Sequence, residues 1–514
     1  MNTYLRFLYE FLGEFFAGLK MIFFGIVNGV KQIFNIPSYI HLIKQYKNDF
    51  SMSEWLLVGI AVFAVSAILI LIILLAYLLI RKYVRFRRTL VDQESMLREV
   101  TELNNKVAKM SKERDEIMAM KVSQLGLSPD ESATEKLGSA DDDKTKAEKE
   151  IEDDDSIRFS RLTLVDRKYA KYKVQNYNND FSLEDICVAF RNFAASRLHL
   201  YYTLPMIRIF MSGLASTKLV ILQGISGTGK TSLAYAWGKF LKHDSCVVSV
   251  QPSWRDRTEL FGYFNEFTKK FNETLLLEHL YTASYTDDMY TVILDEMNLA
   301  RVEYYFAEML SILEMPNRDE WIIEIVASPW ENDPKHVYGG RIKIPPNTWY
   351  IGTINNDDST FMVTDKVYDR AMPIDINDKG QPFEPEDTPP WDVNFSYMDG
   401  LFKQAFEDHP ISQSNWDKIN SMDDYVIKHF RVAFGNRIVS HMGKFVSAYV
   451  ACGGEEVEGI DYFVAKKILR KFEQLNIAYI KDEIDGFVVF LDKTFGKGKM
   501  KECIEYMLRL KKLG

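Results

Sequence analysis

The sequence has little of what disulfide-rich or metal-binding domains depend on. Its 514 residues include only four cysteines and eight histidines. The cysteines (Cys187, Cys246, Cys452 and Cys503) are far apart in the chain, so they match neither a zinc-binding spacing nor a Cys-x-x-Cys redox motif. A dense disulfide framework is excluded as well, and this cysteine usage is typical of a reducing compartment.

Positive charge is not in excess either. The chain carries 63 Lys and Arg against 72 Asp and Glu, a formal net charge of −9. A broadly basic protein that coats nucleic acid is therefore disfavoured, although a local basic patch is left open. Hydrophobic residues make up 47% and charged residues 26% of the chain, which is ordinary for globular domains. The length suggests about three to four units of roughly 150 residues.

One long apolar run departs from this average. Residues 55–80 are 26 residues without a charged side chain. As a helix they would reach roughly 39 Å, enough to cross a hydrocarbon core of about 30 Å. We predict a transmembrane helix over residues 55–80, with a buried core helix as the alternative. Five cations follow it and predict a single-pass protein of the plasma membrane whose body is cytoplasmic; they are Arg81, Lys82, Arg85, Arg87 and Arg88.

The segments around this run predict a membrane anchor and a tether. Residues 1–50 are expected to associate with the membrane, because apolar residues recur at helical spacing over residues 5–36. This pattern favours an amphipathic helix that lies on the bilayer over a second crossing helix. Residues 81–122 predict a short juxtamembrane coiled coil or, alternatively, a single solvated helix. Residues 123–156 are acidic and simple in composition, which predicts a disordered linker.

A phosphate-binding motif opens the C-terminal body. An apolar run at 219–223 is followed by GISGTGKTS and then by a helical pattern. A strand, a G-x-x-x-x-G-K-[ST] loop and a helix form the context of a P-loop, whose glycine amides surround a β-phosphate. Lys230 is expected to neutralise β- and γ-phosphate oxygens, and the Thr231 hydroxyl to bind Mg²⁺. The predicted nucleotide-binding residues of this loop are Gly224, Ile225, Ser226, Gly227, Thr228, Gly229, Lys230, Thr231 and Ser232.

Polar residues after two further predicted strands suit nucleotide hydrolysis. The run TVILDEMN contains Asp295 and Glu296 at the end of its apolar part. Asp295 is predicted to hold Mg²⁺ through its water shell, and Glu296 to act as general base for the attacking water. Asn355, at the tip of the next apolar run, is a candidate to orient the same water or to contact the γ-phosphate. Arg370 is a candidate finger that reaches the nucleotide of a neighbour in a ring.

Together these motifs resemble a known family. The P-loop, the run Leu294–Glu314 and the segment before Arg370 look like the AAA+ modules of the dynein-related group, and most like its McrB-like members. The likeness covers roughly residues 190–475. It implies an α/β P-loop fold of three layers with a parallel sheet over residues 157–385. A helical lid and further C-terminal helices are implied over residues 386–514, and a hexamer-like ring of identical chains.

The resemblance also implies roles for single residues. FGNR resembles the sensor-2 segment of the family, so Arg437 is expected to sense the γ-phosphate in its own chain, while Arg370 is supported as the finger in trans. The expected substrate is ATP, with GTP as the alternative, together with Mg²⁺. The DNA-reading N-terminal domain of the family has no counterpart here, and direct nucleic-acid binding is left open. Arg255 and Arg257 are the candidates for such a contact, or for one with a peptide.

The favoured function is a membrane-anchored AAA+ ATPase that drives or remodels a partner. The resemblance suggests restriction of foreign DNA as its setting, with a separately encoded nuclease or effector subunit as partner. A nucleotide-gated membrane scaffold or sensor with slow hydrolysis is one alternative. A dynein-related chaperone that remodels membrane complexes is another. All three share the same nucleotide site, so the motifs alone do not separate them.

Overall fold

The computed structural model divides the chain into two compact units, Met1–Glu135 and Lys136–Gly514. The described residues are seven single positions between 24 and 44, and then 154, 156–173, 177, 179–355, 360–377, 380–475 and 477–513.

The predicted membrane helix at 55–80 and the coiled coil at 81–122 lie outside these residues. Nearly all of the region 1–50 and of the linker predicted at 123–156 lies outside them too. Within the described part of the chain, no helix is long and apolar enough to cross a membrane.

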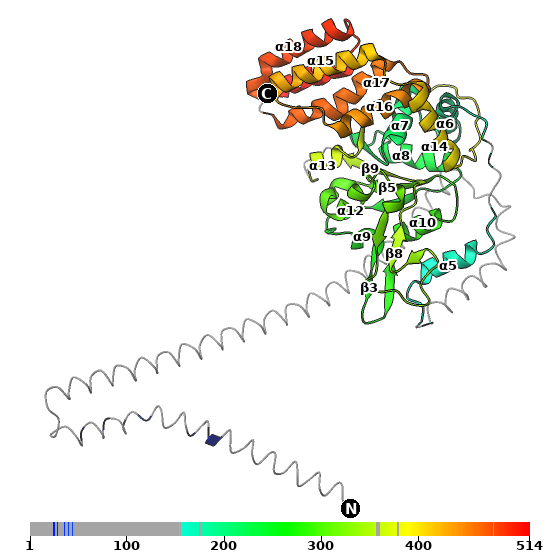
Figure 1. Cartoon of the computed structure of the whole chain (residues 1–514), viewed down its shortest axis with the longest axis vertical. Helices are drawn as coiled ribbons and strands as arrows, with labels where there is room; N and C mark the ends of the chain where they lie inside the picture. Colours follow the sequence, from blue (N-terminus) through cyan, green and yellow to red (C-terminus); the bar gives the residue numbers. More distant parts are fainter. Residues whose placement is uncertain are drawn as a thin grey trace, which may run out of the picture. The chain divides into compact units, whose positions relative to one another are not determined.

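A five-stranded parallel sheet forms the centre of the second unit (Figure 1). Because every neighbouring pair is parallel, the carboxyl ends of all five strands meet at one edge of the sheet. In spatial order the strands are β10 (Met372–Asp375), β1 (Leu219–Gly224), β9 (Thr348–Asn355), β5 (Tyr290–Asp295) and β2 (Cys246–Ser249).

Helices cover both faces of this sheet, as the side-chain alternation along β1 shows. Val220 and Leu222 belong to one buried cluster, together with helices α7 (Leu204–Ser216) and α8 (Lys230–Phe240). Leu219 and Ile221 belong to a second cluster, which contains residues of α10 (Leu275–Ala283) and α12 (Ala307–Ile312). Successive residues of a strand point to opposite faces, and a strand buried on both sides is apolar throughout. The predicted three-layer α/β arrangement with a parallel sheet is confirmed.

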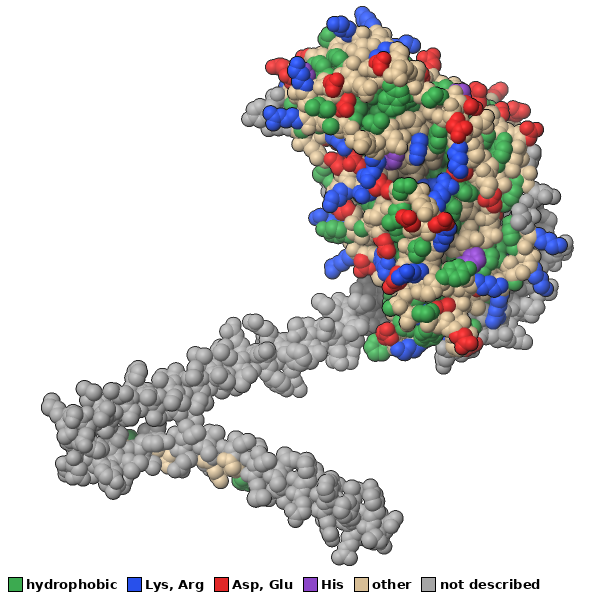
Figure 2. Space-filling model, in the orientation of Figure 1, with side chains coloured by type: hydrophobic (Ala, Val, Ile, Leu, Met, Phe, Trp, Pro, Cys, Tyr) green, Lys and Arg blue, Asp and Glu red, His purple; other side chains and the backbone are tan. Residues whose placement is uncertain are grey.

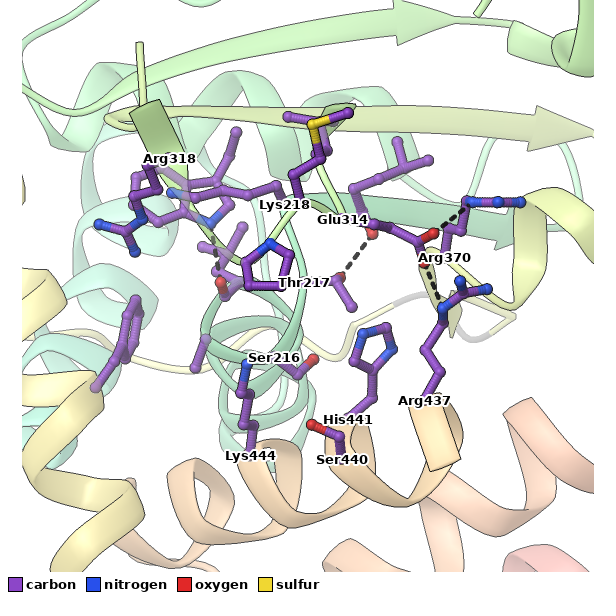
Figure 3. A pocket seen from close by; sticks show the side chains of 18 of the residues that line it. Ser216, Thr217, Lys218, Glu314, Arg318, Arg370, Arg437, Ser440, His441 and Lys444 are labelled. Carbon is purple, nitrogen blue, oxygen red and sulfur yellow. Dashed lines mark hydrogen bonds and ion pairs between the residues drawn. The ribbon is translucent and has the colours of Figure 1, made fainter. Parts of the chain in front are cut away.

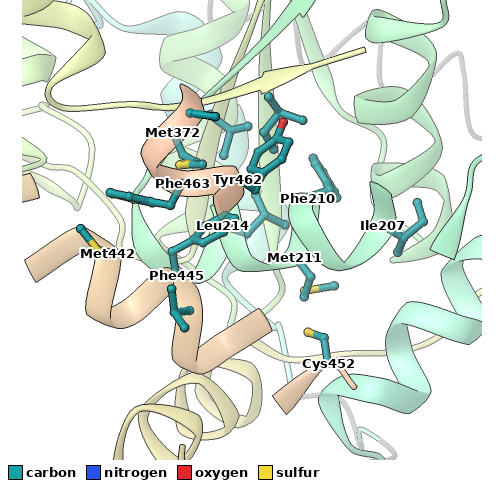
Figure 4. Close-up of a cluster of buried hydrophobic side chains, with 14 of the residues drawn as sticks. Ile207, Phe210, Met211, Leu214, Met372, Met442, Phe445, Cys452, Tyr462 and Phe463 are labelled. Carbon is teal, nitrogen blue, oxygen red and sulfur yellow. The ribbon is translucent and has the colours of Figure 1, made fainter. Parts of the chain in front are cut away.

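The C-terminal part is helical, as predicted, and it packs on the sheet domain through α16. Figure 4 shows this contact, where Met442 and Phe445 of α16 lie near Leu214 of α7 and near Phe463. Figure 1 shows α15 to α18 gathered at one end of this unit. The helices are α14 (Phe395–Asp408), α15 (Gln413–Phe430), α16 (Asn436–Ala451), α17 (Glu456–Phe463), α18 (Ile477–Phe495) and α19 (Lys501–Leu513). Between α17 and α18 the chain forms a π-helical turn, η4 (Val464–Ile468), and a 3₁₀ turn, η5 (Leu469–Gln474).

Smaller elements complete the unit. Two antiparallel sheets are formed by β3 (Gly262–Asn265) with β4 (Lys270–Glu273), and by β8 (Arg341–Lys343) between β6 (Ile322–Glu324) and β7 (Val337–Tyr338). The remaining helices are α5 (Ser160–Tyr169), α6 (Leu183–Leu198), α9 (Thr258–Phe261), α11 (Val302–Tyr305) and α13 (Asp365–Tyr368), with 3₁₀ turns η2 (Met297–Leu299) and η3 (Arg318–Glu320).

Candidate functional site

The glycine-rich loop joins the carboxyl end of β1 to the start of α8. Gly227 and Gly229 have φ angles of 79° and 92°, which lie in the left-handed region that glycine adopts without strain. The ammonium group of Lys230 lies within the loop, where it donates to the carbonyl oxygens of Gly224 at 3.0 Å and Ile225 at 2.7 Å. The first N–H groups of α8 have no partner inside the helix, and with the helix dipole they favour a phosphate.

Asp295 connects this loop with the two neighbouring strands. Its Oδ1 accepts a hydrogen bond from the hydroxyl of Thr231 at 2.8 Å and another from the hydroxyl of Thr353 at 2.8 Å. Hydroxyl and carboxylate oxygens are ligands that Mg²⁺ prefers, and Mg²⁺ is usually held by one or two carboxylates together with phosphate oxygens. Thr231 and Asp295 therefore fit the predicted Mg²⁺ site. No cluster of three or more His, Cys, Asp or Glu suited to a metal occurs among the described residues.

Glu296 follows β5 directly, and its side chain points toward the tip of β9. Its φ of 52° is left-handed, an uncommon value for a residue with a side chain. The Thr353 hydroxyl accepts the N–H of Glu296 at 2.9 Å and holds this turn. The Glu296 carboxylate accepts from Asn355 Nδ2 at 3.4 Å. Since Asn355 pairs in register with Gly224, the predicted base and the predicted water-orienting amide lie beside the phosphate-binding loop.

Two supporting residues were missed by the sequence analysis. One is Thr353, which is only 3% exposed. The other is Asn298, whose Nδ2 donates to the Asn355 carbonyl at 3.2 Å and to Thr360 Oγ1 at 2.9 Å. Asn298 thereby holds the segment that follows β9 against the turn that follows β5. The sequence could have indicated Thr353 through its spacing from Asn355. It lies two residues earlier, so the two side chains share one side of the strand.

The two predicted arginines lie at the other edge of the sheet. Arg370 precedes β10, which runs parallel to β1, so it lies at the amino ends of the strands. Its Nε donates to Glu314 Oε2 at 2.7 Å. Arg437, near the start of α16, forms an ion pair with the other oxygen of the same carboxylate at 2.7 Å, as Figure 3 shows.

Arg437 does not lie where its expected role would place it. A residue that senses the γ-phosphate of its own chain should lie near Lys230, but Arg437 lies beside Arg370. The reason is the packing of α16 on α7, because α7 ends where β1 begins. The expected role in its own site does not fit this arrangement.

A basic cavity of about 640 Å³ surrounds the Glu314 carboxylate (Figure 3). Burial holds the pKa of Lys218, one of its lining residues, well below the usual value, so the positive charge of the lining comes mainly from its arginines and its other lysines. Such a lining suits an anionic ligand, because guanidinium and ammonium groups bind phosphate and carboxylate oxygens. The Lys and Arg residues that line it are Lys218, Arg318, Arg370, Lys403, Arg437 and Lys444, and two acids, Glu314 and Asp399, line it as well.

The two arginines considered for nucleic-acid or peptide contact lie in the loop before α9. Arg257 Nη1 forms an ion pair with Glu308 Oε2 at 2.8 Å, whereas the Arg255 side chain is exposed. On the face drawn in Figure 2, Lys and Arg side chains are interspersed with Asp and Glu side chains. The contact with nucleic acid or peptide stays a prediction.

Known proteins resemble parts of this chain. No protein-family model matches it. Over 179 residues it is 27% identical to the type IV methyl-directed restriction enzyme EcoKMcrB subunit of Escherichia coli K12. The match covers 33% of this chain and 38% of that protein, so the chain spans well under half of that relative's length. With the P-loop and the α/β fold, this similarity supports an AAA+ NTPase of McrB-like kind.

Two solved structures are also similar. One is a candidate ATPase from Cytophaga hutchinsonii, at 12% identity over 65% of this chain and 96% of that chain, with a TM-score of 0.41. The other is a full-length MCM homologue from Methanopyrus kandleri, at 9% identity over 55% of this chain and 61% of that chain, with a TM-score of 0.32.

Proposed function

We propose that this chain is a membrane-anchored AAA+ NTPase that hydrolyses ATP, or GTP in its place, within an oligomeric ring and thereby drives or remodels a partner. The observation that carries the proposal is the hydrogen bonding of Thr231 and Thr353 to one oxygen of Asp295. This contact joins a phosphate-binding loop to two strand ends that carry a metal ligand, a base and an amide. An NTP hydrolase needs all of these groups at one point.

The residues divide the work as follows. Lys230 and the N-terminus of α8 would bind the phosphates, and Thr231 and Asp295 would hold Mg²⁺, which supplies positive charge against the phosphates when it is bound. Glu296 accepts the proton of the attacking water. Asn355 donates to the Glu296 carboxylate at 3.4 Å and thereby helps to orient it.

The position of Arg370 and Arg437 supports a ring. Both lie at the amino ends of the strands, away from the loop of their own chain, and both line the basic cavity. In a ring this cavity would face the nucleotide of a neighbouring chain, and the two arginines would leave Glu314 to neutralise its phosphate charge. A hexamer-like ring is therefore part of the proposal.

The cellular setting is proposed from two sources. The apolar run at 55–80 supports attachment to the plasma membrane, with the nucleotide-binding body in the cytoplasm. The relative named as a subunit of a methyl-directed restriction enzyme supports a role in anti-phage restriction, with a separately encoded nuclease or effector as the partner that is driven.

The proposal is tested by phosphate release from the full chain with Mg²⁺ and either ATP or GTP. We expect multiple turnovers with at least one of them, and no turnover by Lys230→Ala. Lys499→Ala is the matched control, because this exposed lysine lies 3.6 Å from Glu455 in a surface ion pair, and such pairs contribute little. A wild-type chain that releases no phosphate from either nucleotide in the presence of Mg²⁺ would refute the proposal.

A further inference from the structure

A second cavity lies beside the phosphate-binding loop, at the carboxyl ends of the strands. Its volume is about 340 Å³, and Gly224 and Asn355 of the candidate site line it from the sheet. The C-terminal helical part lines its other side with three cations and one acid, Glu473, while Asp375 lines it from the sheet. The cations outnumber the acids. The three cations are Lys466, Arg470 and Arg509.

Arg470 is the cation of this cavity that has a buried donor without an acceptor among the described residues. Lys466 forms ion pairs of 3.0 Å with Asp375 and with Glu502. In contrast, the guanidinium of Arg470 lies over the ring of Tyr368, 3.0 Å from its centre. Within the described residues, its buried Nη1 has no hydrogen-bond partner. A buried charged donor without an acceptor is costly, and a phosphate oxygen in the cavity would supply that acceptor.

The ring under Arg470 is tied to the strand that precedes the loop. The Tyr368 hydroxyl donates to Gln223 Oε1 at 2.9 Å, and Gln223 Nε2 donates to Asp375 Oδ1 at 2.6 Å. Burial raises the pKa of Tyr368 to about 12, so its hydroxyl stays a donor at neutral pH. Gln223 directly precedes Gly224, where the phosphate-binding loop begins.

The same short segment also holds the turn that carries Arg370. Lys467 Nζ donates to the carbonyl oxygen of Ala371 at 2.8 Å, and Lys471 forms an ion pair of 2.9 Å with Asp369. Both neighbours of Arg370 are thus bound by η4 and η5. A π-helical turn followed by a 3₁₀ turn often marks a functional hinge.

We infer that Arg470 is a positioning residue that couples the two edges of the sheet. Its guanidinium contacts the terminal phosphate of the nucleoside triphosphate bound in the same chain. Through Tyr368 and the turn at 369–371 it then sets the position of Arg370 at the other edge. The inference rests on the proposed function, since it adds a residue to that nucleotide site. A diphosphate lacks the terminal group, so Arg470 distinguishes the triphosphate from the diphosphate state.

The first test compares nucleotide affinity. With Mg²⁺ and fluorescent nucleotide analogues, we expect Arg470→Ala in the full chain to weaken triphosphate binding about tenfold, the effect of losing one charge-assisted hydrogen bond. Diphosphate binding should change less than about twofold, and Arg470→Lys should recover part of the triphosphate affinity. Arg197→Ala is the matched control, because Arg197 pairs with Asp387 on the surface at 2.8 Å. Equal weakening for both nucleotides would overturn the inference.

The second test asks whether Arg470 acts on the neighbour. Chains with Glu296→Gln alone, or with Glu296→Gln and Arg470→Ala together, are mixed with wild-type chains at saturating nucleotide. We expect the double variant to lower turnover of the wild-type chains further, because its Arg370 is misplaced. Tyr368→Phe, which keeps the ring and removes the bond to Gln223, should act in the same direction and serves if Arg470→Ala does not fold. Equal turnover in both mixtures overturns the coupling, whereas an inactive wild-type chain would instead refute the proposed function.

Discussion

The hydroxyl of Thr353 is shared by both acidic residues of the site. It donates to Asp295 and accepts the N–H of Glu296, so the metal ligand and the base are positioned by one buried side chain. A buried hydroxyl with both partners is favourable, whereas an unpaired one is costly. The spacing of the two acids therefore depends on β9, although both belong to the segment around β5.

The first prediction concerns a single residue, Glu296, changed to Gln. The amide keeps the shape of the side chain but accepts a proton poorly, so we expect hydrolysis to fall at least about 100-fold, the usual contribution of a general base. Triphosphate affinity should stay within about twofold. Phosphate release and fluorescent-nucleotide binding measure the two effects. Glu324→Gln, on exposed β6 and paired with Arg341, is the control and should hydrolyse normally; unchanged turnover in Glu296→Gln would contradict the base assignment.

The second prediction concerns His441 and pH. Burial, together with the charges of Lys467, Lys444 and Arg437, lowers the pKa of His441 to about 2. The unfolded chain, with a histidine pKa near 6.5, binds a proton that the folded chain does not bind between about pH 2 and 6.5. Stability contributed by neutral His441 is therefore fully present above about pH 6.5 and is lost as pH falls, by at most about 1.4 kcal/mol per pH unit.

Denaturant unfolding at pH 7 and pH 5 measures this effect. The wild-type chain should lose unfolding free energy from pH 7 to pH 5. We expect this loss to be smaller in His441→Gln, by up to about 2 kcal/mol. His409→Gln is the control, because the His409 side chain is exposed, and it should keep the wild-type fall. The same fall in both variants would contradict the burial of a neutral His441.

Among the elements, β1, β5 and β9 could be predicted, because each is an apolar run followed by polar residues. The edge strands β2 and β10 could not: each has four residues, and β10 contains Pro373, which fits an edge position but weakens any strand signal. The place of α16 could not be predicted either, since it depends on contacts with α7, more than 200 residues earlier in the chain. For that reason the loop and the acids could be predicted together, whereas the place of Arg437 beside Glu314 could not.

A contact between β9 and η2 leads to the third prediction. A Cβ added at Gly352 would lie 1.9 Å from Met297 Sδ, and Met297 is fully buried. Gly352→Ala should therefore destabilise the fold by about 1–3 kcal/mol, as overpacking usually does. Gly400→Ala in α14 has open space at the added Cβ and should stabilise by up to about 1 kcal/mol. Denaturant unfolding of both variants measures the difference, and equal stability would contradict the close contact.

In the whole molecule, the candidate functional residues lie at two opposite edges of the sheet. The acids and the loop lie at the carboxyl ends of the strands, while Arg370 and Arg437 lie at the amino ends beside Glu314. One chain therefore does not bring its own Arg370 and Arg437 to its own terminal phosphate in this arrangement. If the protein is a ring, every complete site is built by two chains. One chain supplies the loop and the acids, and its neighbour supplies the arginines, so a chain that lacks one set can still contribute the other set to a complete site.

The fourth prediction uses this complementarity. Arg370→Ala alone should lower hydrolysis on the order of 10³-fold, the effect of losing an arginine finger, and Glu296→Gln alone should be inactive. In a 1:1 mixture, a site is complete when the chain that binds the nucleotide carries Arg370→Ala and so keeps Glu296, while its neighbour carries Glu296→Gln and so keeps Arg370. One site in four meets this condition, so we expect about a quarter of wild-type turnover to return. Phosphate release from mixed chains measures this recovery. A mixture of Glu296→Gln with Glu296→Gln/Arg370→Ala lacks the base in every chain and is the negative control. Recovery no greater than in that control would show that Arg370 acts within its own chain. If each site were formed by a single chain, every site in the mixture would lack either Glu296 or Arg370.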